Sequence, residues 1–225
     1  MDVTPSALGR ELDFPAVVSP GKPPNALERL AVAERYKNGE AVYRCNEPID
    51  YWYRIVGGAA RKCSSTADGY RHIVDFLLPG DLFGFGARGV RPFCVEAIVP
   101  GTLIARYPRQ NAERLADSDP QVSREIREAA FDSIARLQRR RVILSRTSAI
   151  ERVGAFLVEM ADRGHTGPSE TVSLPMSRYD IADYLGMAVE TVSRALTELR
   201  TRRAIALNGV RRVRICDRPA LALDP

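Results

Sequence analysis

The residues between positions 35 and 108 alternate between short apolar runs and breaks that contain glycine. The runs cover residues 40–44, 51–56, 72–78, 94–99 and 102–107. Short β-rich runs separated by regular turn signals are typical of an antiparallel sandwich or barrel. The pattern therefore predicts a β-structured unit in the first half of the chain.

The residues after position 119 follow a helical period instead. Asp119-Pro120 is typical of a helix start, and apolar residues then recur at helical spacing until about residue 146. Such a narrow stripe can line the protein's own sheet or pair with a second copy, and the basic run at 136–141 favours pairing. We expect the dimer interface to include Val122, Ile126, Ala130, Leu137 and Leu144. A second helix is predicted over about 150–163.

The segment from Met176 to Ile205 carries the clearest functional signal. It predicts a short helix over 178–185, a turn at 186–188 and a second helix from about residue 189. A small residue at Ala182, a left-handed turn residue at Gly186 and a core residue at Val192 have the spacing of a helix-turn-helix. A generic pair of helices is the alternative.

The second of these helices displays side chains that can read bases. Glu190 and Arg194 are four residues apart, with Ser193 beside them near the helix N-terminus. That end of a recognition helix meets base edges in the major groove, where Arg binds guanine and Glu accepts from cytosine. The alternative is an ion pair within the helix, and both can hold together.

A β-hairpin is predicted after the second helix. Residues 205–207 and 210–215 read as strands, and Asn208-Gly209 between them predicts a type I′ turn. Three arginines on this hairpin form a basic wing suited to phosphates: Arg211, Arg212 and Arg214.

Composition and charge narrow the possible functions. The 225 residues carry a net charge of +5, and residues 176–216 hold eight arginines against four acidic residues. A compact basic module indicates a polyanionic partner. Two histidines and the lack of a phosphate loop or metal-ligand spacing argue against an enzyme. Apolar runs too short to span a membrane and an N-terminus unlike a signal peptide predict a cytoplasmic protein, with residues 1–27 as a mobile tail.

The order of these features resembles the CRP/FNR superfamily of bacterial transcription regulators, from about residue 27 to 214. The sequence PGDLFG at 79–84, the long helix and the helix-turn-helix occur in the family's order, and DIADYLG and VETVSR are similar to its FNR and FixK branches. The resemblance implies an α+β fold with an antiparallel β-roll like a cyclic-nucleotide-binding domain, a long dimerisation helix and a C-terminal winged helix-turn-helix. The expected domains are 28–118, 119–146 and 147–225.

The resemblance also assigns roles to residues. Glu190, Ser193 and Arg194 would read a TTGAT-N4-ATCAA-like palindrome, bound by a homodimer. The residues that would hold phosphates are Ser177, Arg178, Thr191 and Arg211. RNA polymerase is the further expected partner, and activation of low-oxygen genes the expected role.

Departures from the family pattern predict that the protein has no cofactor. The position of the family's ribose-binding Glu is occupied by Phe85, and the phosphate-binding pair reads Arg91-Pro92, so cAMP is not expected. Residues 1–44 contain no cysteine, so an iron–sulfur cluster is not expected either. The sequence leaves open a ligand-gated regulator that senses haem or nitric oxide, with His72 and His165 as the available histidine ligands. Cys216 is a candidate redox thiol, with an inert thiol as the alternative, and the other cysteines are expected in the core.

Overall fold

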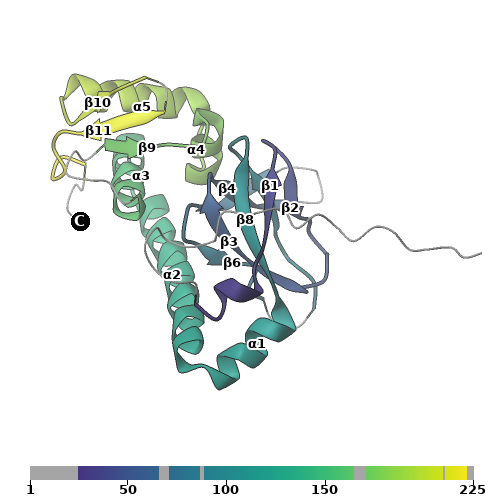
Figure 1. Cartoon of the computed structure of the whole chain (residues 1–225). Coiled ribbons are helices and arrows are strands. Elements are labelled where there is room, and N and C mark those ends of the chain that lie inside the picture. The colour runs from purple at the N-terminus through teal and green to yellow at the C-terminus, as the bar shows by residue number, and fades with distance from the viewer. Residues whose placement is uncertain (1–24, 66–70, 87–88, 165–170, 210, 222–225) are drawn as a thin grey trace, which may run out of the picture.

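The computed structural model describes residues 25–65, 71–86, 89–164, 171–209 and 211–221, and its elements run from a β-roll through two helices into a C-terminal helical unit (Figure 1). The fold is the α+β arrangement that the sequence predicts. Of the predicted tail, residues 25–27 are described, and there Leu27 is fully buried while the Asn25 amide donates to Glu125 at 2.8 Å. None of the described helices has the length and apolar character that a membrane span needs.

The roll consists of two four-stranded antiparallel sheets that face each other. The first sheet has the order β1-β8-β3-β6 and the second β2-β7-β4-β5. The strands are β1 (Val32–Tyr36), β2 (Ala41–Tyr43), β3 (Tyr51–Gly57), β4 (Ala60–Ser65), β5 (Arg71–Leu77), β6 (Leu82–Phe83), β7 (Cys94–Ala97) and β8 (Thr102–Pro108). All five predicted runs contain strands, whereas β1, β4 and β6 were not predicted from the pattern.

The space between the two sheets is filled by aromatic and branched side chains. Tyr43, Tyr53 and Phe83 stack with ring centroids 5.3–6.3 Å apart. Ile55 and Val95 are fully buried in the same cluster. This packing leaves the roll with a solid interior core.

Two helices lead from the roll to the C-terminal unit. A single 3-10 turn, Glu28–Leu30, precedes β1, and α1 (Arg109–Ser118) follows β8. The long helix α2 (Pro120–Ser145) begins as predicted, because the Asp119 carboxylate accepts hydrogen bonds from the backbone N–H groups of Gln121 and Val122 and Pro120 occupies the first turn. It ends one residue before the predicted limit.

The C-terminal unit contains three helices and a small sheet. The elements are α3 (Ala149–Arg163), β9 (Thr171–Ser173), α4 (Arg178–Leu185), α5 (Val189–Thr201), β10 (Ile205–Leu207) and β11 (Arg212–Ile215). The sheet has the order β10-β11-β9 and is antiparallel. Strand β9 was not predicted from the sequence.

One hydrophobic cluster joins this unit to the roll. Phe76 of β5, Phe156 of α3 and Tyr184 of α4 pack with ring centroids 5.1–6.2 Å apart. Because the three rings come from both parts of the chain, the roll and the C-terminal unit share one core. This contact positions the helices of the candidate site.

Candidate nucleic-acid interface

The first helix of the site, α4, begins at a capping box. The Ser177 hydroxyl accepts a hydrogen bond from the Asp180 backbone N–H at 3.1 Å, and the Asp180 carboxylate accepts from the Ser177 N–H at 3.0 Å. The two side chains also bond directly at 2.7 Å. This reciprocal cap fixes the N-terminus of α4, where Ser177 and Arg178 were predicted to hold phosphates.

The turn between α4 and α5 has the predicted geometry. Gly186 adopts a left-handed conformation with φ +63°, and its N–H group bonds back to the carbonyl of Ala182. Ala182 and Val192 are buried with Ile181, so α5 crosses α4 over a small side chain. The helix-turn-helix expected from residues 178–205 is therefore present.

The base-reading candidates lie on the first two turns of α5. Glu190 and Arg194 are exposed and Ser193 is half-buried, where its hydroxyl accepts a hydrogen bond from Arg178 at 3.4 Å. The structure shows no ion pair between Glu190 and Arg194, both of which it describes; the i, i+4 pair of α5 joins Glu198 to Arg202 at 2.9 Å instead. The Arg194 guanidinium thus points to solvent, and an exposed guanidinium can bind a guanine edge.

The phosphate candidates come from the start of α4, the first turn of α5 and the wing. Ser177 is exposed at the start of α4, Arg178 and Thr191 are half-buried, and Arg211 is exposed on the wing. The contact between Arg178 and Ser193 brings one phosphate candidate beside a base-reading candidate.

The wing differs from its prediction. A type I′ turn at Asn208-Gly209 would pair Leu207 with residue 210, but the structure pairs Leu207 with Val213. Of the two turn residues only Gly209 has a positive φ, whereas a type I′ turn requires both. The prediction of this turn is wrong, because pairing of β11 with β9 on its other edge sets a different register and lengthens the loop.

The arginines of the wing point away from its core. Val213 and Ile215 of β11 are buried, while Arg212 and Arg214 between and beside them are exposed by strand alternation. Arg211 is exposed as well, and its carbonyl accepts a hydrogen bond from the Leu174 N–H at 2.8 Å. The basic side chains therefore lie on the solvent side of the wing, as expected.

In the roll, Arg91 has no free face for a ligand. It is 3% exposed, and its guanidinium donates to the carbonyls of Tyr51 at 2.8 Å, Pro48 at 3.3 Å and Gly84 at 3.5 Å. The same group lies 4.0 Å from the ring centroid of Tyr43, whose pKa is raised by burial. An arginine that a nucleotide phosphate could use is here bound by the protein itself.

Phe85, at the expected position of the ribose-binding carboxylate, is also part of the packing. Its ring lies 5.2 Å from that of Trp52 in an edge-on arrangement. The pair belongs to a cluster that includes Tyr107, whose pKa burial raises to about 12. An apolar contact therefore replaces the hydrogen-bonding group expected at a ribose site.

The predicted interface residues of α2 differ in exposure. Val122 is 1% exposed and packs against the roll with Ile126, whereas Leu137 is exposed, and Ala130 and Leu144 are half-buried. The exposed apolar side chains of α2 are Phe131, Ile134, Leu137 and Val142. Sequence reasoning omitted Phe131, which is 66% exposed, and the spacing of three between Phe131, Ile134 and Leu137 was the signal for it.

Of the three cysteines expected in the core, the structure buries one completely. Cys63 is buried, but Cys94 is only half-buried, and Cys45 lies half-buried in a turn after β2. Burial raises the pKa of Cys63 to about 12 and that of Cys94 to about 11, which disfavours the reactive thiolates. Cys216 is exposed and donates to the Arg214 carbonyl at 3.8 Å, and its redox role stays a prediction.

The two histidines were the candidate haem ligands. The imidazole of His72 lies on β5 with its Nδ1 3.8 Å from the Asp183 carboxylate, at the border with α4. His165 lies outside the described residues. Among the described residues, no cluster of three or more His, Cys, Asp or Glu side chains could hold a metal ion.

A helix-turn-helix with a basic wing, joined by a long helix to a β-roll, defines a transcription regulator that binds DNA. Comparison with known proteins agrees. The family model described as "Crp-like helix-turn-helix domain" matches residues 151–223, and "Cyclic nucleotide-binding domain" matches residues 33–119.

Relatives with similar sequences identify the family. The chain is 39% identical to the nitrogen fixation regulation protein FixK of Rhizobium meliloti (strain 1021), over 89% of this chain and 90% of that one. It is 37% identical to the transcriptional activatory protein AadR of Rhodopseudomonas palustris, over 82% and 79%. The solved structure of FixK2 from Bradyrhizobium japonicum matches with a TM-score of 0.77 and 36% identity, over 85% and 95%. The chain belongs to the CRP/FNR family of transcription regulators and is a FixK-like member.

Proposed function

We propose that the protein binds a TTGAT-N4-ATCAA-like palindrome as a homodimer and activates genes of low-oxygen metabolism together with RNA polymerase in the cytoplasm. The observation that carries the proposal is the exposure of Glu190 and Arg194 on the first turns of α5, with the Ser193 hydroxyl between them. Arg can bind guanine O6 and N7, Glu can accept from cytosine N4, and Ser can contact either kind of edge. The three groups match the chemistry of a mixed half-site.

The phosphate contacts follow from the position of the donors around α5. Arg178 at the start of α4 lies beside α5 through its contact with Ser193, Arg211 is exposed on the wing, and Ser177 and Thr191 are further hydroxyl donors. Contacts to phosphates fix the register of a protein on the duplex and carry no base information. Arg211 therefore contributes to affinity for every sequence, and Arg194 to the choice of base.

The homodimer is supported by the exposed apolar side of α2. Phe131, Ile134, Leu137 and Val142 expose apolar surface along a helix whose opposite side packs on the roll through Val122 and Arg136. A second copy of α2 would cover this surface by coiled-coil packing. The proposed interface therefore shifts from the predicted residues to these four, with Leu137 common to both sets.

Independence from a nucleotide effector is supported by the interior of the roll. Arg91 already binds three backbone carbonyls and lies over Tyr43 of the core between the two sheets. A cyclic nucleotide would have to displace these contacts and leave carbonyls without a partner, at about 1–3 kcal/mol for each. We therefore propose that the dimer binds DNA without cAMP.

Fluorescence anisotropy at ~0.15 M salt, in the range where non-specific DNA binding is weak, tests the proposed function. The purified protein is titrated against three labelled duplexes: the TTGAT-N4-ATCAA palindrome, the same duplex with one half-site scrambled, and a fully scrambled duplex. Preference for the palindrome over the single half-site supports both the reading of the sequence and the dimer. Equal affinity for all three duplexes would refute the proposal.

A further inference from the structure

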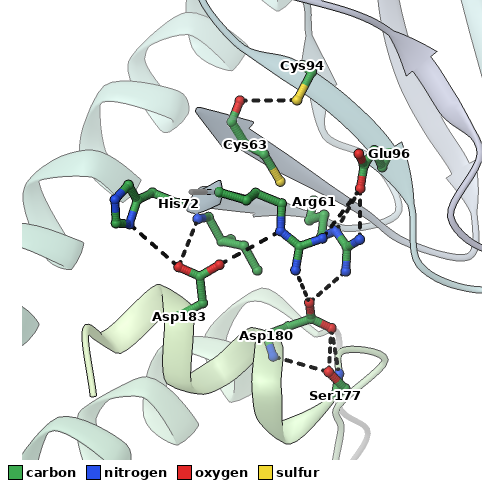
Figure 2. Close-up of polar contacts among 10 residues, drawn as sticks. Arg61, Cys63, His72, Cys94, Glu96, Ser177, Asp180 and Asp183 are labelled. Atoms are coloured by element: carbon green, nitrogen blue, oxygen red, sulfur yellow. Dashed lines mark hydrogen bonds and ion pairs between the residues drawn. The ribbon is translucent and has the colours of Figure 1, made fainter. Parts of the chain in front are cut away.

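Two carboxylates of α4 face the roll and not the DNA side of the helix-turn-helix. Figure 2 shows Asp180 and Asp183 directed from α4 toward Arg61 and the strands of the roll. The two residues are three positions apart, so they lie on the same side of α4. Asp180 is 5% exposed, which means that its charge requires a partner within the protein.

Arg61 of β4 is that partner. One terminal nitrogen of its guanidinium donates to the Asp180 carboxylate at 2.7 Å. Its Nε and its other terminal nitrogen donate to the Glu96 carboxylate of β7 at 3.1 and 2.8 Å. Glu96 therefore orients a guanidinium that reaches from the roll to the capping box of α4.

The neighbouring strand holds the second carboxylate. Arg71 of β5 lies 3.9 Å from Asp183 and 3.6 Å from Asp180. The backbone N–H group of Ile73 donates to the Asp183 carboxylate at 3.4 Å. Strands β4 and β5 therefore hold α4 at Asp180 and Asp183, through the side chains of two arginines and one backbone N–H group.

The long helix α2 contacts the other end of α4. The Arg140 guanidinium of α2 donates to the Tyr184 carbonyl at 3.1 and 3.3 Å and lies 4.7 Å from the centroid of the Tyr184 ring. In Figure 1, α4 lies between the roll and α5, and α5 is on the outer side. The contacts of Arg61, Arg71 and Arg140 with α4 therefore fix the orientation of the helix-turn-helix relative to α2. They leave the outer side of the recognition helix uncovered.

We propose that Arg61 and Arg71 are positioning residues for DNA binding, which set the spacing between the two recognition helices of the dimer without touching DNA. The inference rests on the proposed function. A palindrome rewards two helices held at the correct separation, because the second half-site then binds at high effective concentration. Without the contacts of Arg61 and Arg71, α4 and α5 can change orientation. This change lowers the effective concentration of the second half-site, while each single helix-turn-helix keeps its own affinity.

The test compares the wild type with Arg61→Met, Arg71→Met and the double variant. The matched control is Arg106→Met, because Arg106 and Arg71 have side chains of the same 38% exposure, and the ion pair of Arg106 with Glu34 at 3.1 Å lies within the roll. Affinity is measured by anisotropy on a single half-site and on palindromes with spacers of three, four, five and six base pairs. Thermal melts identify any variant that fails to fold, and Arg71→Met then serves alone.

The double variant is expected to lose roughly tenfold in affinity for its preferred palindrome, a part of the ~10²–10⁴ that linkage of two sites can supply. Its single half-site affinity should stay within twofold, and its preference among spacers should flatten. Arg61→Lys, which keeps the charge and one hydrogen bond, should retain most of the preference. Arg106→Met should behave as the wild type.

Three results are decisive against the proposal or its basis. An equal loss of affinity on the half-site and on the palindrome would mean that the arginines serve stability alone. An unchanged or higher palindrome affinity would mean that the contacts of Arg61 and Arg71 do not position the helices for DNA. Either result overturns the inference. A wild type that shows no preference for any palindrome would overturn the proposed function instead. The two failures are therefore distinguishable.

Discussion

Arginines have opposite surroundings at the two ends of the molecule. In the roll, Arg91 is buried and its guanidinium donates to three carbonyls, whereas Arg194 on α5 and Arg211 on the wing are exposed. The same cation therefore completes the interior of one region and forms the surface of the other. Phosphate-binding capacity therefore depends on which arginines keep accessible donors: Arg91 is enclosed by its acceptors, whereas Arg194 and Arg211 are accessible at the surface.

The largest effect on DNA affinity is expected at the proposed contact between the α2 helices of the dimer. Phe131→Glu places two like charges in the proposed contact between α2 helices, and such a juxtaposition costs several kcal/mol. Palindrome affinity should fall on the order of 100-fold, which corresponds to ~3 kcal/mol. Sedimentation velocity should show a monomer.

The control for this variant is Gln121→Glu, which adds the same charge at an exposed position in the first turn of α2. It should remain a dimer with wild-type affinity. If Phe131→Glu also remained a dimer, the proposed role of the exposed side of α2 would be incorrect.

Arg91→Met tests the role of the buried arginine in the roll. The variant leaves the carbonyls of Tyr51, Pro48 and Gly84 without their donor, so the free energy of unfolding should fall by roughly 2–3 kcal/mol. Denaturant titration measures this loss. Affinity of the folded variant for the palindrome should stay within twofold, since the carbonyls and rings that Arg91 contacts all belong to the roll. A variant of wild-type stability would contradict the structural role of Arg91.

Arg194→Ala tests the exposed arginine of the recognition helix α5. It should cost ~1–3 kcal/mol per half-site and relax the choice at one base position, because a bidentate contact with guanine is lost. Anisotropy on duplexes that carry each base at that position measures both changes. Arg211→Ala is the matched comparison and should weaken binding to all sequences alike while lowering the salt slope. Unchanged base discrimination in Arg194→Ala would refute its assigned role.

The smallest effect is expected in the core shared by the two regions. Burial raises the pKa of Glu159 on α3, and its Oε1 has no hydrogen-bond partner among the described residues, while the Tyr184 hydroxyl donates to Oε2 at 3.5 Å. Because the folded pKa lies above the unfolded value, the wild type loses stability as the pH rises from the unfolded pKa through the folded one. Glu159→Gln should remove this loss and make the protein more stable than the wild type at pH 7. Melts from pH 4 to 8 measure it, and parallel curves for the two proteins would contradict the expected titration.

Elements defined by local chemistry were predictable from the sequence. The range of α4, the left-handed Gly186 and the Asp119 cap of α2 depend on neighbouring residues, and the structure has each of them. The type I′ turn of the wing was wrong because a distant strand, β9, decides the register of β11. Local turn preference is weaker than pairing along a whole strand edge.

Contacts between distant segments could not be predicted. The helical period of α2 gives an apolar stripe but not the part of it that the roll covers, so the buried Val122 and the exposed Leu137 were both assigned to the dimer interface. The contact of Arg61 with Asp180 joins residues 119 positions apart, and no spacing rule identifies it. The same holds for Arg91, whose acceptors come from two separate segments, at 48–51 and at Gly84.

The central claim is that the roll is closed and that the C-terminal unit binds DNA without an effector. The most direct test is to unfold the purified protein in guanidinium, remove small molecules by dialysis, refold it and titrate the palindrome with and without cAMP. We expect the same affinity before and after this treatment and no response to cAMP. Loss of selective binding after refolding, restored by cAMP or by the small molecules removed in dialysis, would contradict it.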